Sequence, residues 1–206
     1  MAEKSRERER PTFIEETRRK QIIESTILTL AERGFINTSL ADIADNIGVT
    51  KGVISYHFDN KDELIDATLE TIIQTQVGLR QTRIDEQISP VEKFKAYILA
   101  NLEFLRVYPT YVPAMIELWA NYSTPKAKDR FNHTAYEPAR LQLGEIFLLG
   151  QEQGVFACFD HLTMASLIQG MIDGVTFQWS FNPGHLDLDK SFEEITDLFM
   201  KRMLAS

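Results

Sequence analysis

The sequence contains a single cysteine, Cys158, among its 206 residues. One thiol can neither form a disulfide within the chain nor supply a cysteine-based zinc site, and such sparse usage is typical of a reducing cytosol. We therefore expect a cytoplasmic protein. Because Cys158 stands in the apolar run Val-Phe-Ala-Cys-Phe, we also expect its thiol to be buried and inert.

Long apolar runs are absent as well. The uncharged apolar stretches stay below the roughly 18–20 residues that a membrane span requires. The charged N-terminus is not followed by the apolar segment of a secretory signal. The sequence therefore predicts neither a membrane-spanning nor an exported chain.

Residue patterns that indicate catalysis are also missing. There is no glycine-rich phosphate loop and no nucleophile elbow. The histidines are scattered without the spacing of metal ligands. We therefore expect no enzymatic activity, no metal and no cofactor. The four histidines are His57, His133, His161 and His185.

The composition that remains is that of a globular protein, with 44% hydrophobic and 25% charged residues. The net charge of −8 is unevenly placed, because the first 60 residues have a net charge of −1 and the others −7. Basic residues are thus concentrated toward the N-terminal end. This placement permits contact with nucleic acid there without proving it.

The apolar positions recur at helical spacing throughout, and no hairpin or alternating strand pattern is present. The sequence therefore predicts an all-α fold. Capping residues, glycines and prolines divide it into helices. Pro138 should kink or divide the longest one. The expected helices cover residues 12–34, 39–46, 50–56, 61–84, 90–107, 111–121, 125–153, 160–181 and 188–204.

Two short helices flank Gly48 within residues 38–58, and a glycine there permits a tight reversal of the backbone. Their apolar residues can form one small core, so the segment predicts a helix-turn-helix. In that motif the second helix enters the major groove of DNA. The core residues are Leu40, Ile43, Ala44, Ile47, Val49 and Ile54.

The residue types after the turn suit contact with DNA. Hydroxyl and ammonium groups can bind phosphate or a guanine edge, a glycine permits close approach, and rings can contact thymine methyl groups. A lysine at the start of the next helix can reach the flanking phosphates. These residues are Thr50, Lys51, Gly52, Tyr56, His57 and Lys61.

The run TSLADIADNIGVTKGVISYHFDNKDEL resembles the DNA-binding signature of the TetR family, and the likeness extends over residues 16–66. The resemblance implies a helix-turn-helix DNA-binding domain at 12–60 and a ligand-binding and dimerisation domain at 61–206. It adds Ser39 as a phosphate contact. It also marks Ser55 as a departure, where the family commonly has tyrosine. The form Ile-Ser-Tyr-His-Phe resembles the BetI-like branch.

The N-terminal tail allows two interpretations. Arg6, Arg8 and Arg10 could reach into a minor groove. Glutamates alternate with them, however, and a solvated tail is the favoured interpretation.

For the implied ligand pocket, the aromatic residues of the later helices are the candidates. Aromatic walls beside a carboxylate from Glu103, Glu117 or Asp173 would attract a cation. The competing interpretation is that an aromatic stripe at helical spacing is simply core. The candidates are Phe94, Tyr97, Phe104, Tyr108, Tyr111, Trp119, Asp173 and Phe177.

For the implied dimer, small residues four positions apart would let two helices approach closely. The competing interpretation is packing within one chain. The candidates are Ser166, Gly170 and Gly174 on one helix and Leu141, Gly144 and Leu148 on another.

These expectations converge on a homodimeric regulator that binds a palindromic operator in double-stranded DNA and is released by a small-molecule effector. An activator or architectural DNA binder of the same fold, without a ligand, is the alternative. A helical enzyme fits less well because catalytic residue patterns are missing, and a carrier fits less well because it would not need residues 38–58.

Overall fold

The computed structural model describes residues 12–122 and 124–204. Over these residues the chain is helical, and its only β feature is an isolated bridge between Phe156 and Leu204. The expected all-α fold is confirmed. In the same residues, no helix combines the length and the apolar character needed to cross a membrane.

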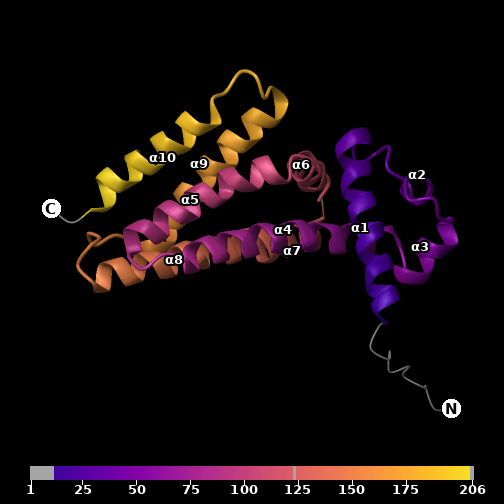
Figure 1. Cartoon of the computed structure of the whole chain (residues 1–206), viewed down its shortest axis with the longest axis horizontal. Helices are drawn as coiled ribbons and strands as arrows, with labels where there is room; N and C mark the ends of the chain where they lie inside the picture. Colours follow the sequence, from indigo (N-terminus) through magenta and orange to yellow (C-terminus); the bar gives the residue numbers. More distant parts are fainter. Residues whose placement is uncertain (1–11, 123, 205–206) are drawn as a thin grey trace, which may run out of the picture.

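Three helices form an N-terminal unit at one end of the molecule (Figure 1). They are α1 (Phe13–Arg33), α2 (Leu40–Asn46) and α3 (Lys51–His57). Both α1 and α2 begin with a capping box. Between α2 and α3, Gly48 has a φ of +64°, with no other atoms near the position of a Cβ. Glycine is therefore required there by the left-handed backbone of the turn.

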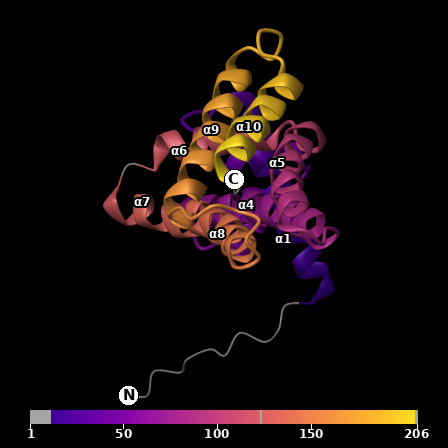
Figure 2. The same ribbon diagram turned by 90° about the vertical axis from the view of Figure 1, so that its left-hand side faces the viewer.

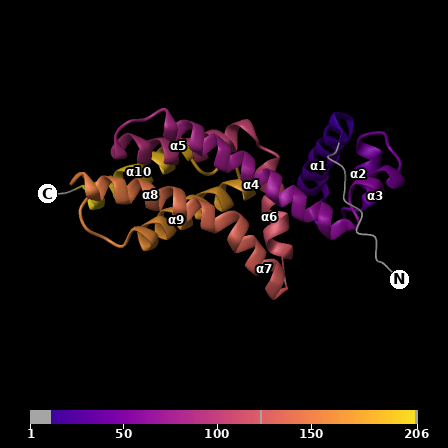
Figure 3. The ribbon, with the colours of Figure 1, turned by 90° about the horizontal axis from the view of Figure 1, so that it is seen from below.

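Helix α4 (Lys61–Asp85) leads from the N-terminal unit into the rest of the molecule, where it packs along α5 (Figures 1 and 3). Viewed from the end opposite the N-terminal unit, α8 and α9 lie together at one side of the bundle (Figure 2). The bundle consists of α5 (Pro90–Val107), α6 (Tyr111–Asn121), α7 (Pro125–Phe131), α8 (Glu137–Glu152), α9 (His161–Phe181) and α10 (Leu188–Met203).

The helix expected over 125–153 is divided, as its internal proline predicts. A π-helical turn, η1 (Asn132–Tyr136), separates α7 from α8. Pro138 has no N–H to donate to a carbonyl one turn back. Just before it, the N–H of Glu137 bonds to the carbonyl of Asn132, five residues earlier. The proline thus sits in the first turn of α8, where its missing donor costs little.

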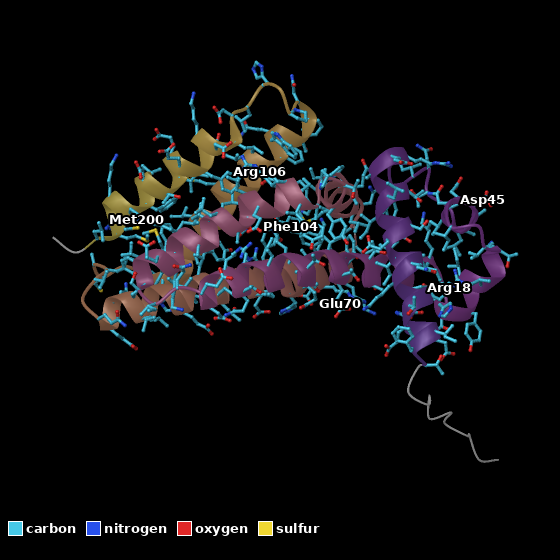
Figure 4. All side chains as sticks on the ribbon, viewed as in Figure 1. Arg18, Asp45, Glu70, Phe104, Arg106 and Met200 are labelled. Atoms are coloured by element: carbon cyan, nitrogen blue, oxygen red, sulfur yellow. The ribbon has the colours of Figure 1, made fainter. Side chains whose placement is uncertain are left out.

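The side chains of the N-terminal unit and the bundle meet in one continuous apolar core (Figure 4). Helix α1 packs directly on α6 as well as on α4. The expectation for Cys158 is wrong, because its side chain is exposed. Phe156, two residues earlier, is buried and forms the isolated bridge with Leu204, so this apolar run places Phe156 in the core and leaves Cys158 at the surface.

Two glycines provide a matched test of the packing. A Cβ on Gly150 would lie 2.0 Å from the buried Phe156 ring, whereas a Cβ on exposed Gly78 in α4 would meet nothing. Gly150→Ala should lower the free energy of unfolding by about 1–3 kcal/mol. Gly78→Ala should raise it by about 0.5–1 kcal/mol. Urea unfolding followed by circular dichroism measures both, and equal shifts would contradict the packing described.

Candidate functional site

Helix α3 presents an exposed polar face to solvent. Lys51, Gly52, Ser55 and Tyr56 are all exposed, and Tyr56 is 74% exposed. Thr50 stands at the N-cap, but its hydroxyl makes no capping bond to the helix. The Thr50 hydroxyl is therefore available to another molecule. Five of the predicted DNA contacts thus share one open surface.

The opposite face of α3 is anchored in the core. Ile54 and Phe58 are buried in the core, and α3 packs on α2 and α1. Arg19 of α1 donates from Nη1 to the carbonyl of His57 at 2.7 Å, and its guanidinium lies 4.0 Å from the centre of the Phe58 ring. It also reaches Glu63 of α4 at 3.5 Å. Arg19, which the sequence analysis missed, thus ties α1, α3 and α4 together.

Tyr56 and His57 are positioned by their neighbours. The Tyr56 hydroxyl donates to Oε1 of Glu15 on α1 at 2.9 Å. The Tyr56 and His57 rings meet edge to face, with their centroids 5.1 Å apart. Burial lowers the pKa of His57, so its imidazole is neutral at neutral pH and can offer hydrogen bonds but no charge. The positive charge of this face therefore comes from Lys51.

Two further predicted DNA contacts, Ser39 and Lys61, form hydrogen bonds with other groups of the chain. Ser39 is the N-cap of α2 and shares a capping box with Asp42. Lys61 departs from the expectation of a free phosphate contact. Its ammonium is half-buried, donates to the carbonyls of Thr38 and Phe35, and lies 4.8 Å from the Phe35 ring. The carbonyl groups between α1 and α2 thus already bind the Lys61 ammonium. Arg6, Arg8 and Arg10 lie outside the described residues.

A cavity of about 240 Å³ opens between α4, α6, η1, α8 and α9. Most of its wall is apolar or aromatic, and its polar groups come from α4 and α9. This pairing of apolar walls with a few polar groups is typical of small-molecule sites. The lining residues are Ile73, Gln76, Arg80, Met115, Ile116, Trp119, Phe131, Ala135, Tyr136, Ala139, Gln169, Asp173, Gly174, Thr176 and Phe177.

Three of the predicted pocket residues, Trp119, Asp173 and Phe177, line this cavity. The other five do not, because they pack in the core between helices. Phe94 stacks on Phe147 and Phe104 on Tyr108, with ring centroids 5.9 and 5.3 Å apart, and Tyr111 bonds to Glu24 of α1 at 2.7 Å. Tyr97 lies one layer behind the wall, where its hydroxyl donates to Gln169 at 2.6 Å. For Phe94, Tyr97, Phe104, Tyr108 and Tyr111 the core interpretation holds.

Among the three candidate carboxylates, only Asp173 lines the cavity. Glu103 pairs with Arg83 at 2.6 Å, and Glu117 accepts the N–H of Phe35 at 2.8 Å. Arg80, Gln76 and Gln169 line it but were missed by the sequence analysis. Arg80 could have been found, since it stands at helical spacing from buried Ile73 and Ile84, where a charge is unexpected.

Asp173 is largely enclosed. Its Oδ1 accepts from Nε2 of Gln169 at 2.7 Å. Burial raises the pKa of Asp173 to about 6, although the bond from Gln169 and the charge of Arg80 oppose the rise. A cation entering the cavity would therefore meet a carboxylate that is poorly solvated. In the described residues no group of three or more metal-ligating side chains comes together.

The predicted dimer residues fall into two groups. Gly144 is buried, and a Cβ there would lie 3.3 Å from His161, so it serves the packing of α8 on α9 within the chain. Gly174 lines the cavity. Ser166 and Gly170 are exposed on α9, and a Cβ on Gly170 would meet nothing. The predicted Leu141 and Leu148 of α8 are exposed as well, and so are Leu162, Leu167 and Met171 of α9.

Comparison with known proteins gives the same picture for the N-terminal unit. The family model described as "Bacterial regulatory proteins, tetR family" matches residues 22–68. The chain is 30% identical over 161 residues to the HTH-type transcriptional regulator BetI of Ectopseudomonas mendocina, covering 75% of this chain and 79% of that protein. It is 28% identical over 119 residues to BetI of Paraburkholderia phymatum, covering 57% of this chain and 61% of that relative's length.

The whole fold also has a counterpart among solved structures. A Saccharomonospora viridis protein in complex with choline aligns with a TM-score of 0.82, over 93% of this chain and all of that one. The identity is 20%, so this likeness concerns the fold alone.

The position of Asp173 generates a pH-dependent prediction. Its pKa is raised on folding, from 3.8 to about 6, so its contribution to stability is fully present below pH 3.8 and is lost as the pH rises through 6. Asp173→Asn imitates the neutral acid. It should raise the free energy of unfolding by up to about 3 kcal/mol above pH 6, with the gain vanishing near pH 4.

Urea unfolding at a series of pH values measures this gain. Asp197→Asn, at an exposed position of α10, is the matched control and should show no such pH dependence. A gain for Asp173→Asn that is constant across the pH range would rule out the raised pKa as its cause.

Proposed function

This chain belongs to the tetR family of bacterial regulatory proteins, and from that premise we propose that it is a dimeric transcriptional repressor released from its operator by a small molecule. The observation that carries the proposal is the open face of α3, whose side chains are exposed while Arg19 of α1 anchors the end of the helix. Recognition helices need this combination, because base contacts must be presented without further ordering.

The proposed DNA contacts are Thr50, Lys51, Gly52, Ser55 and Tyr56, with neutral His57 at the edge of the surface. Lys51 supplies the charge for a phosphate or guanine contact. Glu15 holds the Tyr56 hydroxyl and would keep this large ring in one orientation as the helix docks. Ser39, the N-cap of α2, is the proposed flanking phosphate contact.

Dimerisation is assigned to the exposed apolar face of α8 and α9, around Ser166 and Gly170. A two-fold axis there would place one N-terminal unit on each side. Two recognition helices about 34–36 Å apart would read successive major grooves of a palindrome. The domain limits proposed from the sequence, 12–60 and 61–206, separate these two tasks.

The effector is assigned to the cavity beside Asp173. The related fold in complex with choline supports an organic ligand of this size, and the aromatic wall from Trp119, Tyr136 and Phe177 would attract a cation. Ligand binding alters DNA affinity only when the two protein states bind the ligand differently. A helix that touches both the cavity and the N-terminal unit can provide that difference.

Helix α6 touches the cavity and the N-terminal unit that carries α3. Met115, Ile116 and Trp119 line the cavity, while Glu117 on the same helix accepts the backbone N–H of Phe35 at 2.8 Å. Tyr111 at its start bonds to Glu24 of α1. A ligand that displaces α6 would therefore shift the N-terminal unit and change the separation of the two recognition helices.

The DNA contact is tested with a fluorescent duplex taken from upstream of the chain's own gene. Lys51→Ala should weaken binding about tenfold and reduce the salt slope by about one, because one phosphate contact is lost. Lys201→Ala removes an equally exposed lysine from α10, at the other end of the molecule (Figure 1), and should change neither. Indistinguishable anisotropy titrations for the two variants would exclude the α3 surface.

The coupling through α6 is tested with millimolar choline as the first effector probe. Choline should weaken operator binding by the native chain. In Glu117→Ala this weakening should shrink severalfold, because the charge-assisted bond to Phe35 no longer links α6 to the N-terminal unit. Glu145→Ala, an exposed glutamate of α8, is the control. An unchanged choline response in Glu117→Ala would exclude this route.

A further inference from the structure

A buried guanidinium faces the cavity from α4. Arg80 is only 1% exposed. Its Nε donates to Oε1 of Gln142 at 3.1 Å and its Nη1 to Oδ1 of Asn101 at 3.3 Å. Its guanidinium carbon lies 5.1 Å from the centre of the Tyr97 ring. All of these partners are neutral, and no described residue accepts a bond from Nη2.

Asp173 faces the same cavity from α9. Its Oδ1 accepts from Gln169, whereas Oδ2 accepts no hydrogen bond from any described side chain. Within the described part of the chain, Arg80 and Asp173 form no ion pair with each other or with another residue. The cavity therefore holds one positive and one negative group, each hydrogen-bonded only to neutral partners.

Unpaired charges at a largely enclosed site are costly unless something supplies the missing partner. A simple cation would pair with Asp173 but would bring a like charge near Arg80. A simple anion would pair with Arg80 and bring a like charge near Asp173. Like charges brought together in such a site oppose binding, so each single-charge ligand satisfies one group at the expense of the other.

We propose that the effector is a small zwitterion, whose carboxylate binds Arg80 and whose ammonium group binds Asp173 beside Trp119, Tyr136 and Phe177. This inference rests on the proposed function, because it takes the cavity as the effector site. It narrows the ligand class from an organic cation to a molecule that carries both charges on a small apolar frame. The guanidinium suits the anionic end, because its planar donors match a carboxylate.

Arg80 also has a structural role, since its bonds join α4 to Asn101 of α5 and Gln142 of α8. A purely structural Arg80 would affect every ligand alike. A ligand-binding Arg80 would affect only ligands that carry an anionic group. The comparison of matched ligands therefore separates the two roles.

Isothermal titration of the full-length chain provides the comparison. The zwitterion probe is (trimethylammonio)acetate, with its three- and four-carbon homologues to vary the charge separation. Choline retains the cation without the carboxylate, and 3,3-dimethylbutanoate retains the carboxylate with carbon in place of the charged nitrogen. At least one zwitterion should bind about tenfold or more tightly than both single-charge probes.

The variants then assign each charge. Arg80→Gln should reduce zwitterion affinity to that of choline, without a fall in the affinity for choline itself. Asp173→Asn should reduce the zwitterion affinity to the affinity for 3,3-dimethylbutanoate. Arg80→Lys keeps the positive charge but loses the planar pair of donors. Its affinity for the zwitterion should lie between that of the native chain and that of Arg80→Gln. If Arg80→Gln does not fold, the probe series on the native chain still decides the matter.

Three results would overturn the proposal. Choline or 3,3-dimethylbutanoate could bind the native chain as tightly as every zwitterion, or Arg80→Gln could weaken all probes by one factor. Alternatively, none of the probes could bind, although the chain still binds its operator and Lys51→Ala still reduces the salt slope of that binding. In that last case the zwitterion is refuted and the proposed repressor stands. Failure of operator binding would instead refute the proposed function.

Discussion

The placement of the N-terminal unit depends on one backbone N–H that its own helix cannot satisfy. Helix α1 ends at Gly34, whose φ is +75° and whose N–H bonds back to Leu30. The next N–H, that of Phe35, is bonded instead by Oε2 of Glu117 at 2.8 Å. Gly34 makes room for this approach, because a Cβ there would lie only 3.2 Å from the same oxygen. A charged acceptor from α6 thus completes the end of α1, and such bonds are stronger than those between neutral groups.

This constraint gives α6 an unusual position. In an α-helix successive residues point about 100° apart, so a short helix can present different side chains to two neighbours. Glu117 reaches toward α1, while Ile116 and Trp119 face the cavity. A rotation or shift of α6 that accommodates a molecule in the cavity must therefore move Glu117 as well. In the proposed mechanism, the bond to Phe35 and the bond from Tyr111 to Glu24 would transmit that movement to α1, and Arg19 would pass it on to α3.

Local signals in the sequence predicted the helices well, because each signal acts within a few residues. The capping box at Thr12, the turn at Gly48 and the division at Pro138 all appear in the structure. The cavity was harder to predict, because helical spacing shows that an aromatic residue is buried without showing what it is buried against. Phe94 and Trp119 are both aromatic residues within helices, yet the first packs in the core and the second lines the cavity.

The same limit applies to polar residues, whose roles depend on partners far away in the chain. Lys61 lies on carbonyls more than 20 residues earlier, and Cys158 is exposed although Phe156, two residues away, is buried. Arg80 is the most instructive case. Its bonds to Asn101 and Gln142 bridge three helices, but an apolar side chain at this position would avoid the cost of burying a charge. Asp173 carries a similar cost, as its raised pKa shows. Two such costs beside one cavity are hard to explain by stability alone, and they are expected where a protein must recognise a charged molecule.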